Sequence, residues 1–163
     1  MLPSIRKILF ATDLSDNCAS ALVYAVSMAE KYHARLMVLH VLEPVTSNPY
    51  LQLKGFKSDK EWQSLERDKQ EKLKQILESR LKDLCREIND RLSACQIPDD
   101  HILLEEGVPV EAILQVARKN QADLIVIGTH GYGIVKDALM GGTARRVLRR
   151  STLPVLVVHS GGS

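Results

Sequence analysis

The sequence predicts an α/β fold: a doubly wound, five-stranded parallel sheet with helices on both faces. Three observations support this class. Short apolar runs alternate with longer segments in which apolar residues recur every three or four positions, as buried strands and amphipathic helices require. The resulting order, β-α-β-α-β-α-β-α-β, needs crossover connections between parallel strands. Only 4% of the residues are aromatic, so we expect an aliphatic core.

Length and composition indicate one globular domain spanning residues 1–163. Apolar residues make up 45% of the chain and charged residues 26%, the ordinary mixture for a protein with a packed interior. A chain of this size buries roughly 70% of the surface that it exposes when unfolded. No disulfide or metal is therefore required for stability.

Charge and cysteine usage narrow the possible partners and location. The formal net charge is +2, too small to indicate nucleic acid or an anionic membrane as the main partner. No apolar run approaches the ~18 residues of a membrane span. Cys18, Cys85 and Cys95 are odd in number and lack C-x-x-C spacing, which argues against a disulfide framework or zinc and suits a reducing compartment. We expect a cytoplasmic protein that binds neither nucleic acid nor membrane.

Apolar runs predict the five strands. These runs contain few polar residues, as is typical of parallel strands that are covered on both faces. The predicted strands are Ile8–Ala11, Leu36–Leu42, His101–Leu104, Asp123–Gly128 and Pro154–His159.

Helical spacing predicts the four helices between these strands: 15–33, 58–92, 109–120 and 142–150. Ser15 or Asp16 can cap the first helix by accepting a hydrogen bond from a free backbone N–H group. Ser58 and Glu61 fit a capping box at the start of the second. That second helix would be about 50 Å long. Glutamates and lysines alternate along it, which favours a solvated face, and its length can also serve a partner.

The topology predicts where a ligand binds. In open α/β sheets, ligands bind beyond the carboxyl ends of the strands, where the strand order reverses. This rule selects Asp13, Val41 and the segment that follows Gly128.

That last segment is rich in glycine: Gly128, Gly131 and Gly133 precede Gly141 and Gly142. Glycine lets the backbone approach an anion with its N–H groups turned inward. The helix predicted to start at Gly142 adds free N–H groups and the positive end of its dipole. Five glycines within fifteen residues exceed what a turn needs, so the segment predicts a phosphate site. It matches neither the P-loop nor the dinucleotide fingerprint.

With Gly128-x-x-Gly131, nine residues and then Gly141, the chain resembles the nucleotide-binding branch of the universal stress protein family over nearly its whole length. The family places Ser or Thr after that glycine. Here Gly142 takes the position and Thr143 follows, which removes a side-chain contact to phosphate unless Thr143 or backbone N–H groups replace it. The closing Arg146–Arg149 and Leu153–Val158 segments also look like the family.

The resemblance implies strand order 3-2-1-4-5, ATP or a related adenine nucleotide as ligand, and a homodimer. Asp13 stands where the family's acidic residue meets the ribose and phosphates, and would hold Mg²⁺ through the nucleotide. Val41 stands where backbone groups hold the adenine edge. The expected nucleotide-binding residues are Ala11, Thr12, Asp13, Val41, Gly128, Thr129, His130, Gly131, Gly133, Gly141, Gly142 and Thr143.

Several roles stay open on the residues alone. Asp13 can be a helix cap as well as a ligand residue. His130 can touch phosphate, act in acid–base chemistry or simply be solvated. Lys136, Arg145 and Arg146 can neutralise phosphates or lie in solvent.

Three functions compete. The first is an ATP-binding stress-response or signalling module that acts through its nucleotide state. The second is a slow ATPase or phosphotransferase, which needs a positioned water or nucleophile and usually Mg²⁺. The third is a dimeric interaction protein that has lost nucleotide binding at Gly142. The sequence favours the module, with the homodimer formed through the edge strand 154–159 because an apolar edge needs a cover. Its protein partners are not identified.

Overall fold

The structure of this protein, a computed structural model, describes residues 1–15, 18–43, 59–91, 96–129 and 140–159. Five parallel strands form one sheet in the order β3-β2-β1-β4-β5, which confirms the predicted fold class and strand order. The edge position of β5 follows from that order. The strands are β1 (Lys7–Thr12), β2 (Arg35–Leu42), β3 (Ile102–Glu106), β4 (Leu124–Gly128) and β5 (Val155–Val158).

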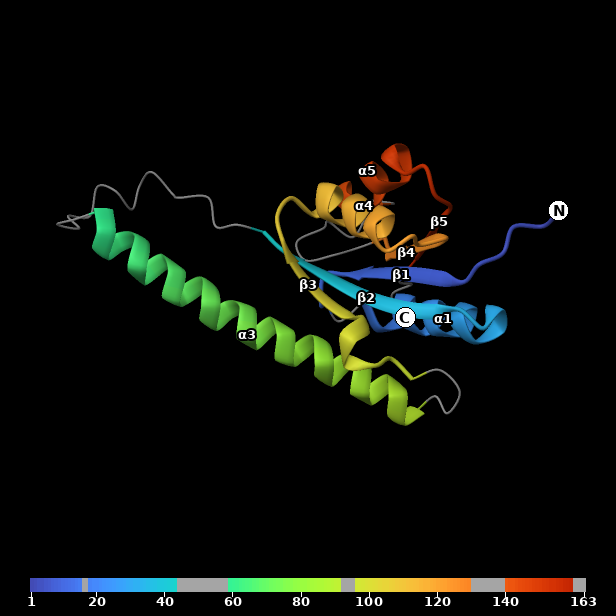
Figure 1. The fold of residues 1–163 in the computed structure, drawn as a ribbon, viewed down its shortest axis with the longest axis horizontal. Helices are drawn as coiled ribbons and strands as arrows, with labels where there is room; N and C mark the ends of the chain where they lie inside the picture. The colour runs from blue at the N-terminus through green and yellow to red at the C-terminus, as the bar shows by residue number, and fades with distance from the viewer. Residues whose placement is uncertain (16–17, 44–58, 92–95, 130–139, 160–163) are drawn as a thin grey trace.

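Helices cover both faces of the sheet, as Figure 1 shows. Helices α4 and α5 lie on one face, and α1 lies on the other, where the C-terminal part of α3 joins it. The helices are α1 (Cys18–Tyr32), α3 (Asp59–Arg91), α4 (Pro109–Lys119) and α5 (Gly142–Arg150), with a short 3-10 helix, η1 (Asp99–His101), before β3.

The central strand β1 shows why the apolar runs are continuous. Ile8 and Phe10 are fully buried in the core cluster that contains α1 and α3. Leu9 and Ala11 belong to the cluster with α4 and α5 on the opposite face. Because successive side chains of a strand point to opposite faces, a strand covered twice needs apolar residues at every position.

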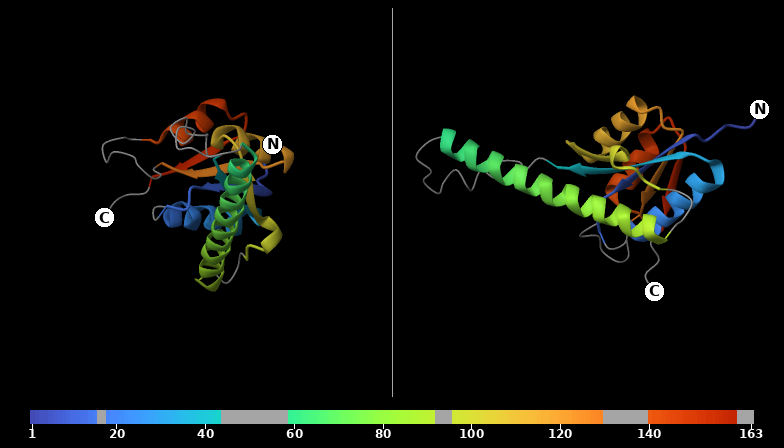
Figure 2. Two further views of the ribbon diagram at one scale, coloured as in Figure 1. Left: turned by 90° about the vertical axis from the view of Figure 1, so that its left-hand side faces the viewer. Right: turned by 60° about the horizontal axis from the view of Figure 1, so that its bottom comes forward.

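Helix α3 extends well beyond the sheet, as the right-hand view of Figure 2 shows. Its buried residues, among those described, are Leu81, Cys85 and Ile88, all in its C-terminal third. Leu73 and Ile76 are 38% and 55% exposed. Burial raises the pKa of the Cys85 thiol to about 12, so this group acts as a small apolar residue in the core.

The predicted element boundaries agree with the structure to within about two or three residues, with two corrections. Strand β3 continues through Glu105 and Glu106, because these carboxylates lie exposed while the backbone still pairs with β2. Ser15 does not cap α1 through its side chain: its buried hydroxyl has no hydrogen-bond partner in the described part of the chain. Asp16 and Ser58, the other predicted cap residues, lie outside the described residues.

Candidate functional site

A pocket of about 610 Å³ opens at the carboxyl ends of the strands, where the order reverses between β1 and β4. We call it the carboxyl-end pocket. Its lining comes from the ends of β1, β2 and β4 and from the first turns of α1, α4 and α5. The lining residues are Phe10–Asp13, Cys18, Ala21, Leu39–Glu43, Pro109, Ile113, Ile127–Thr129, Gly141–Ala144 and Arg146.

Nine of the twelve expected nucleotide-binding residues line this one pocket. They are Ala11, Thr12, Asp13, Val41, Gly128, Thr129, Gly141, Gly142 and Thr143. The other three, His130, Gly131 and Gly133, lie outside the described residues, as does Lys136. Parallel strands bring segments more than 100 residues apart to one edge of the sheet, and the pocket results from that geometry.

The turn after β1 is held in a tight conformation. Leu14 has a φ of 60°, a left-handed value that is uncommon for a residue other than glycine. The Leu14 N–H donates to Thr12 Oγ1 at 3.0 Å, and the Ser15 N–H donates to Asp13 Oδ1 at 3.0 Å. Asp13 therefore makes a local turn and does not cap α1, which begins three residues after Ser15. A carboxylate accepts several bonds, so Asp13 keeps capacity for a ligand.

His40 reinforces the same turn from the neighbouring strand. Its Nδ1 lies 2.8 Å from the carbonyl oxygen of Thr12, its partner in the β1–β2 register. Because a carbonyl only accepts, Nδ1 carries the proton. His40 and Glu43 also line the pocket and were not among the expected site residues; the signal that could have found them is that they lie within two residues of Val41 near the end of a strand.

The opposite side of the pocket is the start of α5. Gly141 precedes this helix in an extended conformation, and no side chain caps its N-terminus. The Gly141 N–H donates to the carbonyl oxygen of Thr129 at 2.6 Å. The first N–H groups of a helix have no partner within the helix and carry its positive dipole end. This end faces the pocket through Gly142 and Thr143, a geometry suited to an anion.

The fold itself does not demand glycine at 128 or 142. A Cβ atom at Gly128 would lie 3.8 Å from the Cβ of Ala21, an ordinary contact. At Gly142 it would meet nothing within 4 Å. Neither residue has a positive φ. Their lack of side chains instead leaves the backbone bare toward the pocket, where a ligand can approach it closely.

Among the described residues, one arginine lines the pocket beside this helix start. Arg146 is among the lining residues, whereas the neighbouring Arg145 is not. A guanidinium recognises phosphate or carboxylate oxygens with paired donors. The remaining lining is largely apolar, with Leu39, Ile113 and Ile127, as expected of a site for a planar organic group.

An ion pair fixes α4 against α5, the two helices on this side of the pocket. Arg150 donates to both carboxylate oxygens of Glu111, one of them at 3.1 Å. The hydrogen bond from Arg150 lowers the pKa of Glu111. Both side chains are about half exposed, so the pair orients the helices and adds little stability.

The pocket offers a limited set of metal ligands. In the described ranges, no three side chains of His, Cys, Asp or Glu gather into a metal site. Mg²⁺ is commonly held by one or two carboxylates together with substrate phosphates and water. Asp13 fits that smaller contribution, so a metal here would arrive with a phosphorylated ligand. Among those same ranges, no helix is long and apolar enough to cross a membrane.

Comparison with known proteins identifies the family. The family model described as "Universal stress protein family" matches residues 4–159. The chain belongs to the universal stress protein family. A universal stress protein of Thermus aquaticus is 35% identical over 154 residues, covering 94% of this chain and 98% of that protein. Universal stress protein MJ0531 of Methanocaldococcus jannaschii is 30% identical, covering 94% and 81%.

Solved structures share the universal stress protein fold. The protein MJ0577 superimposes with a TM-score of 0.77 at 24% identity, covering 99% of this chain and all of that one. A universal stress protein solved in complex with cAMP has a TM-score of 0.59 at 25% identity, covering 98% and 100%. The likeness to MJ0577 shows the fold.

Proposed function

We propose that this universal stress protein is an ATP-binding module that acts through its nucleotide state. The observation that carries the proposal is the carboxyl-end pocket itself. It joins an uncapped helix N-terminus and an arginine to a carboxylate and an apolar floor, within about 610 Å³. The helix N-terminus and the arginine suit phosphates, the carboxylate suits a metal-bound nucleotide, and the apolar lining suits a planar base.

In this proposal the phosphates lie over the start of α5, near Gly142, Thr143 and Arg146. Asp13 meets the ribose or a nucleotide-bound Mg²⁺. The base lies against the apolar lining formed by Leu39, Ile113 and Ile127, and its polar edge is held by the backbone near Val41. Bound Mg²⁺ would neutralise phosphate charge, while the protein's own groups orient the ligand and exclude water.

The comparisons support the ligand class. A universal stress protein of similar fold was solved with cAMP, which is an adenine nucleotide. That ligand has one phosphate, whereas the present pocket combines Arg146 with a helix N-terminus. Two positively charged features favour a ligand with several phosphates, and hence ATP.

We further propose that nucleotide hydrolysis is slow or absent. Phosphoryl transfer needs a positioned nucleophile and charge stabilisation on the transferred group. Among the described lining residues, Asp13 and Glu43 are the carboxylates and there is no lysine. Phosphate release near 10 per second, roughly the ordinary enzyme median, would instead support the alternative of an ATPase or phosphotransferase.

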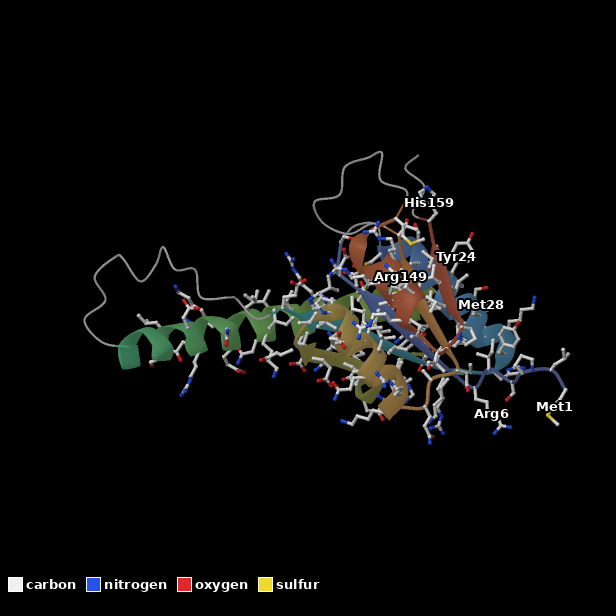
Figure 3. The ribbon with its side chains drawn as sticks, turned by 90° about the horizontal axis from the view of Figure 1, so that it is seen from above. Met1, Arg6, Tyr24, Met28, Arg149 and His159 are labelled. Atoms are coloured by element: carbon white, nitrogen blue, oxygen red, sulfur yellow. The ribbon has the colours of Figure 1, made fainter. Side chains whose placement is uncertain are left out.

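The proposed module is a cytoplasmic homodimer joined through β5. This strand lies at the edge of the sheet, and Val155, Leu156 and Val157 are only partly buried. Tyr24 of the neighbouring helix α1 is 58% exposed, and Figure 3 shows it on the side of the molecule where β5 runs. An exposed apolar edge strand is an association site unless something covers it. The same strand of a second copy, related by a two-fold axis, is the simplest cover.

Calorimetric titration with ATP tests the ligand and its position. We expect Arg146→Gln to weaken ATP binding by about tenfold to a hundredfold, the range for a charged contact to phosphate. Arg149→Gln is the matched control, because Arg149 is exposed on the same helix and does not line the pocket. Asp13→Asn keeps the oxygen that accepts from Ser15 but removes the charge, so it should reduce the Mg²⁺ dependence of binding.

The outcomes separate the three candidate functions. An adenine nucleotide found by mass spectrometry of the purified protein, together with the expected Arg146 effect, supports the module. Equal effects of the two arginine variants would mean that the phosphates do not lie over α5. A parent protein that binds no nucleotide at millimolar concentration would leave the third alternative, an interaction protein that has lost nucleotide binding.

A further inference from the structure

Thr129 connects the carboxyl-end pocket to the last residues of β5. It follows β4, lines the pocket and is 5% exposed. Its N–H donates to the carbonyl oxygen of Val158 at 2.9 Å. Its carbonyl oxygen accepts from the N–H of Gly141 at 2.6 Å. Its hydroxyl lies 3.2 Å from Nδ1 of His159, so one buried residue touches the start of α5 and the end of β5.

His159 is the residue through which this connection reaches the surface. It is exposed and directly follows β5, as Figure 3 shows. Strand β5 contains only four residues, shorter than the usual length of about five or six. A strand this short pairs with few hydrogen bonds, so fixing one more residue in line with it lengthens the edge by a substantial fraction.

We propose that His159 is a positioning residue that couples nucleotide occupancy of the pocket to pairing of the β5 edge with a second copy of the chain. The inference rests on the proposed function, because it needs both the ATP site and the β5 dimer. It adds the route by which the nucleotide state reaches the surface.

The route has two steps. Phosphates bound at the start of α5 hold Gly141 and Gly142, and the hydrogen bond from the Gly141 N–H then holds Thr129. Fixed Thr129 presents its hydroxyl to His159 and its N–H to Val158, which keeps the end of β5 in an extended conformation ready to pair. By thermodynamic linkage, pairing of the two β5 edges must in turn strengthen nucleotide binding, and the factor by which ATP tightens the dimer equals the product of the affinity gains at its two sites.

The test measures this coupling factor in the whole 163-residue chain. Sedimentation equilibrium gives the dimer dissociation constant with and without saturating ATP, and calorimetry gives ATP affinity below and above that constant. In the parent protein we expect ATP to tighten the dimer. His159→Ala should reduce this tightening by about fivefold for each subunit's contact, the value of one ordinary hydrogen bond.

Two further variants separate positioning from a general loss of structure. His159→Asn places a hydrogen-bonding group near the position of Nδ1 and should restore most of the coupling. Thr152→Ala changes an exposed residue close to the opposite end of β5 and should leave the coupling at the parental value. A double replacement with Thr129→Val should lower the coupling no further than His159→Ala alone, because both changes remove the same contact.

The failure of this inference is distinguishable from that of the proposed function. A parent protein that binds no ATP, or that stays monomeric at tens of micromolar, overturns the proposed function and the coupling with it. A parent that binds ATP and dimerises, but whose coupling is absent or survives in His159→Ala, leaves the proposed function standing. That result overturns the role of His159 alone.

Discussion

Replacing Gly142 by serine tests whether the bare start of α5 is a phosphate site. The resemblance to the nucleotide-binding motif implies a hydroxyl residue at this position, and here it is glycine. A serine side chain fits without strain, because a Cβ at Gly142 meets nothing within 4 Å and the residue has no positive φ. Its hydroxyl would enter the pocket that Gly142 and Thr143 already line.

The expected gain is about 1.5 kcal/mol, the lower value for a hydrogen bond to a charged group, which corresponds to roughly tenfold tighter ATP binding. Gly142→Ala is the matched control, since it adds the Cβ and the better helix propensity without the hydroxyl. Calorimetric titration of both variants and the parent gives the comparison. If Gly142→Ser binds ATP no more tightly than Gly142→Ala, the phosphates do not lie at this helix start.

Three other predictions concern the packing of α3 and the ion pair between α4 and α5. Leu81→Ala should lower the free energy of unfolding by about 2–5 kcal/mol, because Leu81 is fully buried. Ile76→Ala, on the same helix but exposed, should lower it by under about 1 kcal/mol. Equal losses in urea titrations would mean that the outer part of α3 is covered. With Cys18 and Cys95 changed to serine, Cys85 should react with a thiol reagent at mildly alkaline pH only upon unfolding, because burial raises the pKa of Cys85 to about 12. Rapid labelling of the native protein would contradict the buried position of Cys85. Glu111 has a lowered pKa in the folded state. Its small contribution to folding stability is therefore present above the unfolded pKa of 4.5 and is lost as the pH falls below that value toward the folded pKa. Glu111→Gln should reduce the slope of stability against pH in this acidic window, and an unchanged slope would show that the ion pair does not persist in solution.

The fold could be predicted because local pattern and topology agree. In β1, Ile8 to Ala11 face the two cores alternately, so continuous apolar character indicated a strand covered on both faces. Helix α5 begins at Gly142 and ends at Arg150 as expected. The rule that ligands bind where the strand order reverses then selected Asp13, Val41 and the end of β4, which do line one pocket.

Contacts between distant segments were beyond sequence reasoning. Nothing local indicates that the Asp123 carboxylate accepts from the N–H groups of Arg6 and Lys7, at 2.8 and 2.9 Å. The bond between His40 and Thr12 likewise depends on the β1–β2 register. Sequence spacing predicted that both Arg145 and Arg146 lie near the proposed phosphate site, whereas in the structure Arg146 lines the pocket and Arg145 does not. Such features arise from tertiary packing, which a single sequence does not encode in a readable pattern.

The long reach of α3 decides what the natural fluorescence of this protein can report. Its single tryptophan, Trp62, belongs to the first turn of this helix. Leu81, the first of the described α3 residues to be buried, lies roughly 29 Å further along the helix axis. Tryptophan emission therefore monitors the outer end of α3, while circular dichroism averages over all the helices. Unfolding curves from the two methods will coincide only if the outer end of α3 melts together with the sheet.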